Sequence, residues 1–328
     1  MKLLQMQSDF RALGHSSFKI SPVALGCWPI AGVTTLGTTE ADSLATIRAC
    51  FDLGINHLDT AYVYGPRGES ETLIGRALGN RRDEMVVATK GGIHFEGKDY
   101  VNDARPETLR RECEESLRRL NTDRVELFYL HAEDPRTPIV ESAGALRELQ
   151  LAGKMRAVGA SNLAVAQLDE FHAVCPLAAV QLPYNMLQRD IELEIVPWCR
   201  SRGIAVTVYW ALMKGLLAGR LSRDGELAES DNRRKYPMYQ GEEWQKNQDF
   251  VDELRAAAAL TGHTVAQLVI NWTIHQPGIT AALCGAKRPD QIRETSGAMS
   301  WELSPEQRLR IEQAIKARGR AEATRVIR

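Results

Sequence analysis

Eight short apolar runs, each followed by a helical pattern, constrain the fold of this chain more than any other feature. Runs of this length are typical of strands buried on both faces of a parallel sheet. The predicted strands are 23–28, 55–61, 85–91, 125–131, 155–161, 177–183, 204–212 and 279–285. Eight strands alternating with helices over 328 residues favour an α/β fold, a (β/α)8 TIM barrel. We expect a single domain over 1–328, with its core at about 22–317 and a basic C-terminal tail.

Cap residues place several of the helices between these strands. Thr39, with Asp42 three residues later, predicts a helix start, and Gly54 follows the end of that helix. Pro106 suits the first position of a helix with one apolar face, formed by Leu109, Cys113, Leu117 and Leu120. Ser304, followed by proline, predicts a last helix that runs to about residue 317.

Composition excludes several classes of protein. The net charge is −1, from 41 basic and 42 acidic residues, so no overall field attracts nucleic acid or an acidic membrane. The six cysteines form no C-x-x-C pair, which indicates reduced thiols rather than disulfides or a zinc site. His57 and His94 fit no metal-ligand spacing, so we expect no metal. Without a signal peptide or a long apolar span, we expect a cytoplasmic protein.

One long polar segment, residues 215–243, interrupts the alternation. Its cations are Arg220, Arg223, Arg233, Arg234 and Lys235. The segment is too long for an ordinary loop after the seventh strand. It is either a lid or binding loop or a solvated surface insertion, and the sequence leaves both open.

Polar side chains stand at the carboxyl ends of six successive predicted strands, where barrels carry their active sites. These residues are Asp59, Lys90, His131, Ser161 with Asn162, Gln181 and Tyr209. Two phenols, Tyr62 and Tyr64, follow Asp59 closely. A phenol has a pKa near 10, and an ammonium held by a carboxylate favours its ionised form. Such a set suits a reaction in which hydride reaches a carbonyl carbon while the oxygen takes a proton.

Each of these residues also has an ordinary structural interpretation. Asp59 could cap a turn, and His131 on its own would be interpreted as an interior histidine. Lys90 could be a solvated lysine or could form a Schiff base, as in barrel aldolases. A Schiff-base lysine must be neutral, however, and a carboxylate partner would keep Lys90 charged.

Several ordered motifs resemble those of the aldo-keto reductases, including the potassium-channel β-subunit-like and sugar-dehydrogenase branches. The motifs are GINHLDTA at 54–61 with Tyr64-Gly65, TKG at 89–91, YLH at 129–131, GASN at 159–162, VQLPYN at 180–185, GLL at 215–217 and GAKRPDQ at 285–291. The resemblance extends from about residue 25 to residue 294.

The resemblance implies a catalytic tetrad of Asp59, Tyr64, Lys90 and His131. In it, Tyr64 rather than Tyr62 gives a proton to the carbonyl oxygen. Lys90, paired with Asp59, lowers the cost of that step, and His131 orients and polarises the carbonyl. The implied activity is reduction of a small aldehyde or ketone, with NADP(H) as cofactor.

The chain lacks a G-x-G-x-x-G motif, so a Rossmann cofactor site is not supported. Hydride chemistry still needs a cofactor. The resemblance implies a nicotinamide cofactor extended across the barrel mouth. Ser161, Asn162 and Gln181 would hold its carboxamide. Tyr209 would stack on the nicotinamide ring or, on the alternative interpretation, fill the barrel end. The backbone at Leu212, Gly215 and Leu217 would approach the pyrophosphate.

The adenosine end of this cofactor would lie where Gly285 leads into a helix start, which suits an anion. Lys287 matches the position that reaches the 2′-phosphate, which favours NADP over NAD, although it could be an ordinary surface charge. Gln291 and Glu294 match adenosine-binding positions. The usual Ser-Pro after the stacking tyrosine is replaced here by Trp210 and alanine, which alters the pocket wall or the loop path.

Trp28 matches a position in the substrate pocket wall, and His94 follows Lys90 closely enough to line the same pocket. Two other functions stay open. One is an NAD-dependent sugar or polyol dehydrogenase, and the other is a redox-sensing, cofactor-binding regulatory subunit. The sequence identifies neither the physiological substrate, nor the preferred direction of reaction, nor the oligomeric state.

Overall fold

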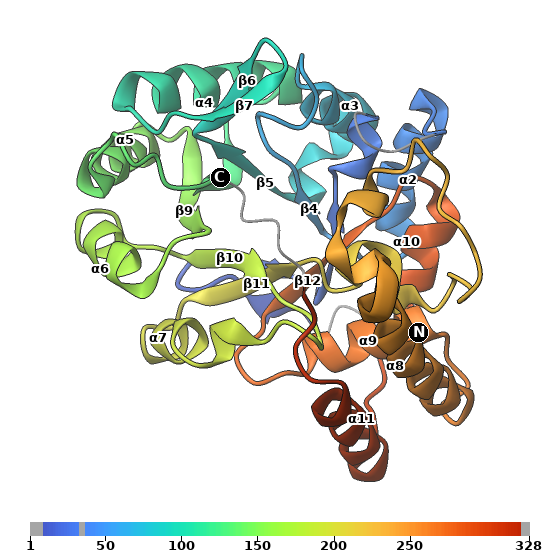
Figure 1. Cartoon of the computed structure of the whole chain (residues 1–328). Coiled ribbons are helices and arrows are strands. Elements are labelled where there is room, and N and C mark those ends of the chain that lie inside the picture. The colour runs from blue at the N-terminus through green and yellow to red at the C-terminus, as the bar shows by residue number, and fades with distance from the viewer. Residues whose placement is uncertain (1–8, 33–36, 323–328) are drawn as a thin grey trace.

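Eight parallel strands close into a barrel inside a ring of helices (Figure 1). The computed structural model that shows this describes residues 9–32 and 37–322. The strands are β3 (Val23–Gly26), β4 (His57–Asp59), β5 (Val86–Gly91), β8 (Val125–Leu130), β9 (Met155–Ser161), β10 (Ala179–Pro183), β11 (Ala205–Tyr209) and β12 (Ala281–Gly285). Each pairs in parallel with the next along the chain, and β12 pairs with β3. The predicted (β/α)8 barrel is therefore confirmed.

The strands are shorter than predicted at several ends. The run 204–212 stops being extended after Tyr209, because Trp210 has a φ of 63° and turns the backbone. The run 55–61 contributes only three residues to β4, and the first strand ends at Gly26, two residues before Trp28. Asp59 and Tyr209 are the last residues of β4 and β11, so the shorter strands still end at the predicted polar residues.

The helices that surround the barrel begin and end near their predicted caps. Thr39 accepts a hydrogen bond from the Asp42 N–H at 3.1 Å, and Pro106 is the first residue of α4. The last helix ends one residue beyond its predicted end. The helices are α2 (Glu40–Asp52), α3 (Glu69–Leu78), α4 (Pro106–Leu120), α5 (Ile139–Leu151), α6 (Val165–Val174), α7 (Ile195–Ser201), α8 (Gly241–Ala259), α9 (Val265–Ile274), α10 (Pro289–Ser296) and α11 (Pro305–Arg318). No helix in the described ranges is long and apolar enough to cross a membrane. The far end of the basic tail, beyond residue 322, lies outside those ranges.

Two hairpins that the sequence did not predict cover parts of the barrel. The first pairs β1 (Arg11–Ala12) with β2 (Lys19–Ile20). Leu13 and Ile20 of this hairpin are fully buried against inward-facing strand residues, so the hairpin closes the amino end of the barrel. The second pairs β6 (Ile93–Glu96) with β7 (Asp99–Asn102), directly after β5.

The segment after β11 is more ordered than predicted. The polar stretch 215–243 overlaps three 3-10 helices and includes the start of α8 at Gly241. The three are η4 (Met213–Ala218), η5 (Asn232–Lys235) and η6 (Pro237–Tyr239). The Tyr239 hydroxyl donates to the carbonyl oxygens of Met213 and Lys214, at 3.3 and 3.0 Å, so the segment folds back on its own start.

Gly75 allows α3 to approach the end of α4 closely. A Cβ at Gly75 would lie 2.7 Å from the carbonyl oxygen of Leu120. We therefore expect Gly75→Ala to lower the free energy of unfolding by about 1–3 kcal/mol. Gly144→Ala on α5 is the control, because its Cβ would meet nothing within 4 Å. Alanine there should raise that free energy by about 0.5–1 kcal/mol. Urea unfolding measures both changes, and equal effects would show that the helix contact is not tight.

Candidate active site

A buried ion pair joins the carboxyl ends of β4 and β5. Lys90 Nζ donates to Asp59 Oδ1 at 2.6 Å and to the Thr60 carbonyl oxygen at 2.7 Å. The second oxygen of Asp59 accepts a hydrogen bond from Gln181 Nε2 at 2.8 Å. Both charged side chains are at most 3% exposed. A pair so deeply buried is tolerated only because each charge also has hydrogen-bond partners.

Tyr64 lies against this ion pair in the turn that follows β4. Lys90 Nζ is 5.0 Å from the centre of its ring, and the Trp28 and His131 rings meet it edge-on at 5.0 and 6.0 Å. No group in the described residues forms a hydrogen bond with its hydroxyl. Burial and the charge of Asp59 raise the pKa of Tyr64 well above its usual range, the opposite of the lowering expected from Lys90. The phenol is therefore protonated at neutral pH, as a proton donor must be.

His131 follows β8 directly and faces the same space. Burial, helped by the charge of Lys90, lowers the pKa of His131 well below its usual range, so the imidazole is neutral at pH 7. Its Nδ1 is buried without a hydrogen-bond partner in the described structure. A neutral imidazole carries one N–H donor, and that donor can polarise a carbonyl oxygen. The backbone N–H of His131 donates to the Gly91 carbonyl oxygen at 2.9 Å, which fixes its position.

Tyr62, the other phenol of the motif, is held outside this cluster. Its hydroxyl donates to Glu115 Oε2 of α4 at 2.6 Å, and the Arg119 guanidinium lies 4.2 Å from the centre of its ring. Since a carboxylate already takes this hydroxyl, Tyr62 has no free proton to offer at the barrel mouth. The placement favours Tyr64 as the proton donor.

Asn162 ties three strand ends together. It has a φ of 60°, which turns the chain out of β9. Its Nδ2 donates to the His131 carbonyl oxygen and to Ser161 Oγ, both at 3.0 Å. Its Oδ1 accepts from the Tyr209 hydroxyl at 2.8 Å. The O–H of Ser161, which is 1% exposed, finds no acceptor among the described residues.

The turn after β11 uses the backbone groups that were predicted to approach a pyrophosphate. The N–H groups of Gly215 and Leu217 both donate to the Leu212 carbonyl oxygen, at 2.9 and 3.1 Å. Gly215 has a φ of 93°, which this turn requires. These residues therefore form the turn itself, and their contact with a phosphate stays a prediction.

The residues predicted to bind adenosine lie just before α10 and along it. The Lys287 N–H donates to Gln291 Oε1 at 2.8 Å, just after β12 ends at Gly285. Glu294 accepts from Arg220 Nη2 at 2.5 Å. Arg220, which the sequence showed only as one cation of the polar segment, thus joins that segment to α10. The sequence could not indicate this pairing, because 74 residues separate the partners.

The two predicted pocket residues have different surroundings. Trp28 packs against Tyr64 and so forms one wall of the site. His94 lies on β6, and its Nδ1 pairs with Glu112 Oε1 at 2.8 Å. Glu112 also accepts the Gly92 N–H at 2.7 Å, and burial raises the pKa of Glu112 to about 7. His94 is therefore bound to α4, and its contact with substrate stays a prediction. Glu112 was missed, because an interior glutamate on a helix carries no motif.

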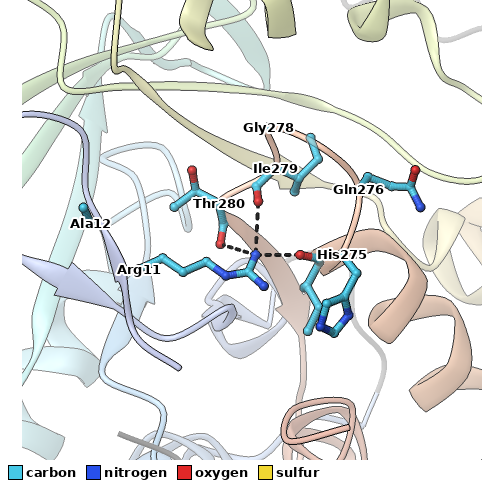
Figure 2. A pocket seen from close by; sticks show the side chains of 8 residues that line it. Arg11, Ala12, His275, Gln276, Gly278, Ile279 and Thr280 are labelled. Carbon is cyan, nitrogen blue, oxygen red and sulfur yellow. Dashed lines mark hydrogen bonds between the residues drawn. The ribbon is translucent and has the colours of Figure 1, made fainter. Parts of the chain in front are cut away.

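A pocket at the other end of the barrel does not belong to this cluster. Arg11 lines it, and its Nη1 donates to three carbonyl oxygens, those of Ile274, Ile279 and Thr280, at 2.6–3.1 Å. Figure 2 shows the guanidinium pointing at the last two. These residues precede β12, whereas the tetrad stands where strands end. The guanidinium joins the first hairpin to the barrel, a structural role.

The residues at the barrel mouth fit a nicotinamide cofactor. The buried Ser161 O–H still needs an acceptor, as a carboxamide oxygen would be. Tyr209 ends β11 and offers an aromatic ring beside the tetrad. The start of α10, with Lys287 just before it, is positively polarised and suits a phosphate. A hydroxyl, an amide, an aromatic ring and a cation thus stand at or near the carboxyl ends of four neighbouring strands, β9 to β12.

Known proteins resemble this chain over nearly its whole length. The profile of the Aldo/keto reductase family matches residues 22–316. Aldo-keto reductase YhdN of Bacillus subtilis is 35% identical over 301 residues, which cover 91% of each chain. The solved glycerol dehydrogenase AKR11B4 from Gluconobacter oxydans has a TM-score of 0.88 at 37% identity, covering 95% of this chain and 97% of its own. Aldo-keto reductase AKR11C1 from Bacillus halodurans has a TM-score of 0.78 at 26% identity, covering 97% and 98%.

The barrel and the site at its mouth define an oxidoreductase that works with a nicotinamide cofactor. The chain belongs to the aldo-keto reductase family, whose profile covers most of its length. It is therefore an NAD(P)(H)-dependent enzyme that acts on carbonyl and alcohol groups.

Proposed function

We propose that this enzyme reduces aldehydes or ketones with NADP(H) and that Tyr64 donates the proton. The observation that supports this most is the Tyr64 hydroxyl, which has no partner among the described residues although it lies beside an ion pair and a neutral histidine. A carbonyl oxygen placed between Tyr64 and His131 would meet two donors. When bound, the cofactor supplies the hydride that the side chains cannot.

The ion pair lowers the cost of proton transfer from Tyr64. As the phenol gives up its proton, negative charge develops near Lys90, whose ammonium is held in place by Asp59. A fixed ammonium stabilises that charge without reorganising at the moment of reaction. His131, being neutral, donates an N–H to the carbonyl oxygen and does not compete as an acid. In the oxidation direction, the Tyr64 phenolate would accept the proton.

A scan of the purified protein tests this proposal. NADPH and NADH would each be offered with a panel of aldehydes, ketones, sugars and polyols, in both directions. We expect turnover of carbonyl compounds with NADPH. Tight binding of the cofactor without turnover of any compound would favour a regulatory subunit and would overturn the proposal.

Lys287 is proposed to select NADP through the 2′-phosphate. A hydrogen bond to a charged group contributes about 1.5–3 kcal/mol, so we expect Lys287→Ala to raise the NADPH Kd about 10- to 100-fold. The NADH Kd should change little. Lys246→Ala, an exposed lysine on α8, is the matched control. Titration of the fluorescence of each cofactor measures both constants, and equal losses for NADPH and NADH would remove Lys287 from the phosphate site.

One structural relative supports a second candidate. The Gluconobacter protein is named a glycerol dehydrogenase. On this alternative, the same tetrad would oxidise a small polyol with Tyr64 as base. Faster oxidation of glycerol or a sugar alcohol with NAD than reduction of any carbonyl with NADPH would favour it.

A further inference from the structure

A chain of buried polar side chains crosses the barrel interior beneath the tetrad. Tyr129 Oη and Thr207 Oγ1 lie 3.1 Å apart, and Gln181 Nε2 lies 3.5 Å from the same Thr207 oxygen. Gln181 Nε2 also donates to Asp59 Oδ2 at 2.8 Å. The four side chains come from β8, β11, β10 and β4, and all are at most 2% exposed. The chain ends at Lys90, which holds the other oxygen of Asp59.

Neighbouring residues fix the position of the Tyr129 ring. A Cβ at Gly159, its partner across β9, would lie 2.4 Å from the Tyr129 ring, so only glycine admits the ring there. The ring centre lies 5.9 Å from Lys90 Nζ, below the ammonium. Burial raises the pKa of Tyr129, so it stays a neutral hydroxyl. A tyrosine of this kind has no motif signature, and Tyr129 was predicted to have no role beyond its place in the YLH match.

We propose that Tyr129 and Thr207 are positioning residues that fix the Gln181 amide so that its Nε2 faces Asp59. A side-chain amide presents an oxygen and a nitrogen of nearly the same shape. If the amide were rotated by half a turn, Gln181 Oε1 would face the Asp59 carboxylate. Two hydrogen-bond acceptors would then lie in contact, which is unfavourable. Thr207 Oγ1 accepts from Gln181 Nε2 in the correct orientation. In the proposed arrangement the Thr207 O–H is directed at Tyr129 Oη, so this oxygen can only accept and does not bind Gln181 Oε1. This inference rests on the proposed function for its catalytic meaning.

The consequence for the reaction passes through the charge of Asp59. That charge raises the pKa of Tyr64, and a donor on Asp59 Oδ2 draws part of the charge away. The titratable groups facing Tyr64 are Lys90, Asp59, His131, Cys27 and Tyr209. Of these, the Gln181 amide touches only Asp59. Loss of the chain should therefore make Tyr64 harder to ionise, and its base form scarcer at any given pH.

The kinetic test compares Tyr129→Phe, Thr207→Val and the double variant. Alcohol oxidation needs the Tyr64 phenolate. In this direction, the curve of log rate against pH should shift to higher pH by about half a pH unit in each variant. The double variant should move no further, because both changes cut one chain. Thr273→Val on α9, a buried threonine bonded to the Val269 carbonyl oxygen, is the control and should not move. Slower turnover with an unmoved pH profile would overturn the positioning role.

A second readout needs no turnover and no cofactor. Thermal unfolding is compared for the parent, Thr207→Val, Asp59→Asn and the double variant. If hydrogen bonds link Thr207 to Asp59 through Gln181, Thr207→Val should lower Tm less in the Asp59→Asn background than in the parent. Equal losses of Tm in both backgrounds would overturn the proposed link between Thr207 and Asp59, even in an active enzyme. Unequal losses of Tm in a protein that reduces no carbonyl compound would instead support the link between these side chains and overturn the proposed function.

Discussion

Replacing Tyr64 with phenylalanine should lower kcat for carbonyl reduction about a hundred- to ten-thousand-fold, the usual contribution of a positioned acid. The ring would remain against Trp28 and His131, so the site should keep its shape. The affinity for NADPH should stay within about twofold of the parent value. The lost hydroxyl has no partner in the described structure, so we expect its removal to affect the reaction step rather than cofactor binding. Steady-state kinetics and cofactor titration measure the two effects separately.

Tyr62→Phe is the matched control for that experiment. It removes a hydroxyl two residues away, which donates to Glu115 on α4 rather than facing the tetrad. This variant should keep most of the parent turnover. If Tyr62→Phe lost activity while Tyr64→Phe kept it, the assignment of the proton donor would be reversed.

Breaking the ion pair should produce the largest loss of stability. Lys90→Met leaves the Asp59 carboxylate buried, at 2% exposure, without its cation. Removing one partner of a buried pair costs about 3–5 kcal/mol of the free energy of unfolding, because the other charge stays desolvated. Turnover should fall as well, since no ammonium remains to stabilise the Tyr64 phenolate. Urea unfolding at pH 7 measures the first effect.

The double variant Asp59→Leu/Lys90→Met separates stability from function. Apolar side chains of similar volume commonly replace a buried ion pair at little cost, so most of the lost stability should return while turnover stays low. Arg110→Met breaks an exposed pair with Glu148 and should cost far less. If the double variant were as unstable as Lys90→Met, an uncompensated charge would not explain the loss.

Much of the fold was predictable because its signals are local. Thr39 caps α2 through a hydrogen bond from a residue three positions later, Pro106 is the first residue of α4, and both lie where predicted. The barrel strands are continuous apolar runs whose carboxyl ends meet at one face, so Asp59, Lys90 and His131 could be grouped before their distances were known.

The missed features depend on contacts between distant segments. The first hairpin has strands of two residues each, too short for any periodicity, yet Leu13 closes the barrel through contacts made with strands far along the chain. The pairing of Arg220 with Glu294 joins residues that share no pattern. The direction of the Tyr64 pKa shift was missed because burial, which outweighs Lys90, is a property of the packed structure.

The most direct test follows the hydride itself. NADPH carrying deuterium at the reactive position of its nicotinamide ring is incubated with the protein and an aldehyde or ketone that it consumes. Mass spectrometry of the alcohol should show one deuterium on the former carbonyl carbon for each NADPH oxidised, and Tyr64→Phe should form this product far more slowly. Oxidation of NADPH without deuterated alcohol, or equal rates in the two proteins, would contradict carbonyl reduction with Tyr64 as the proton donor.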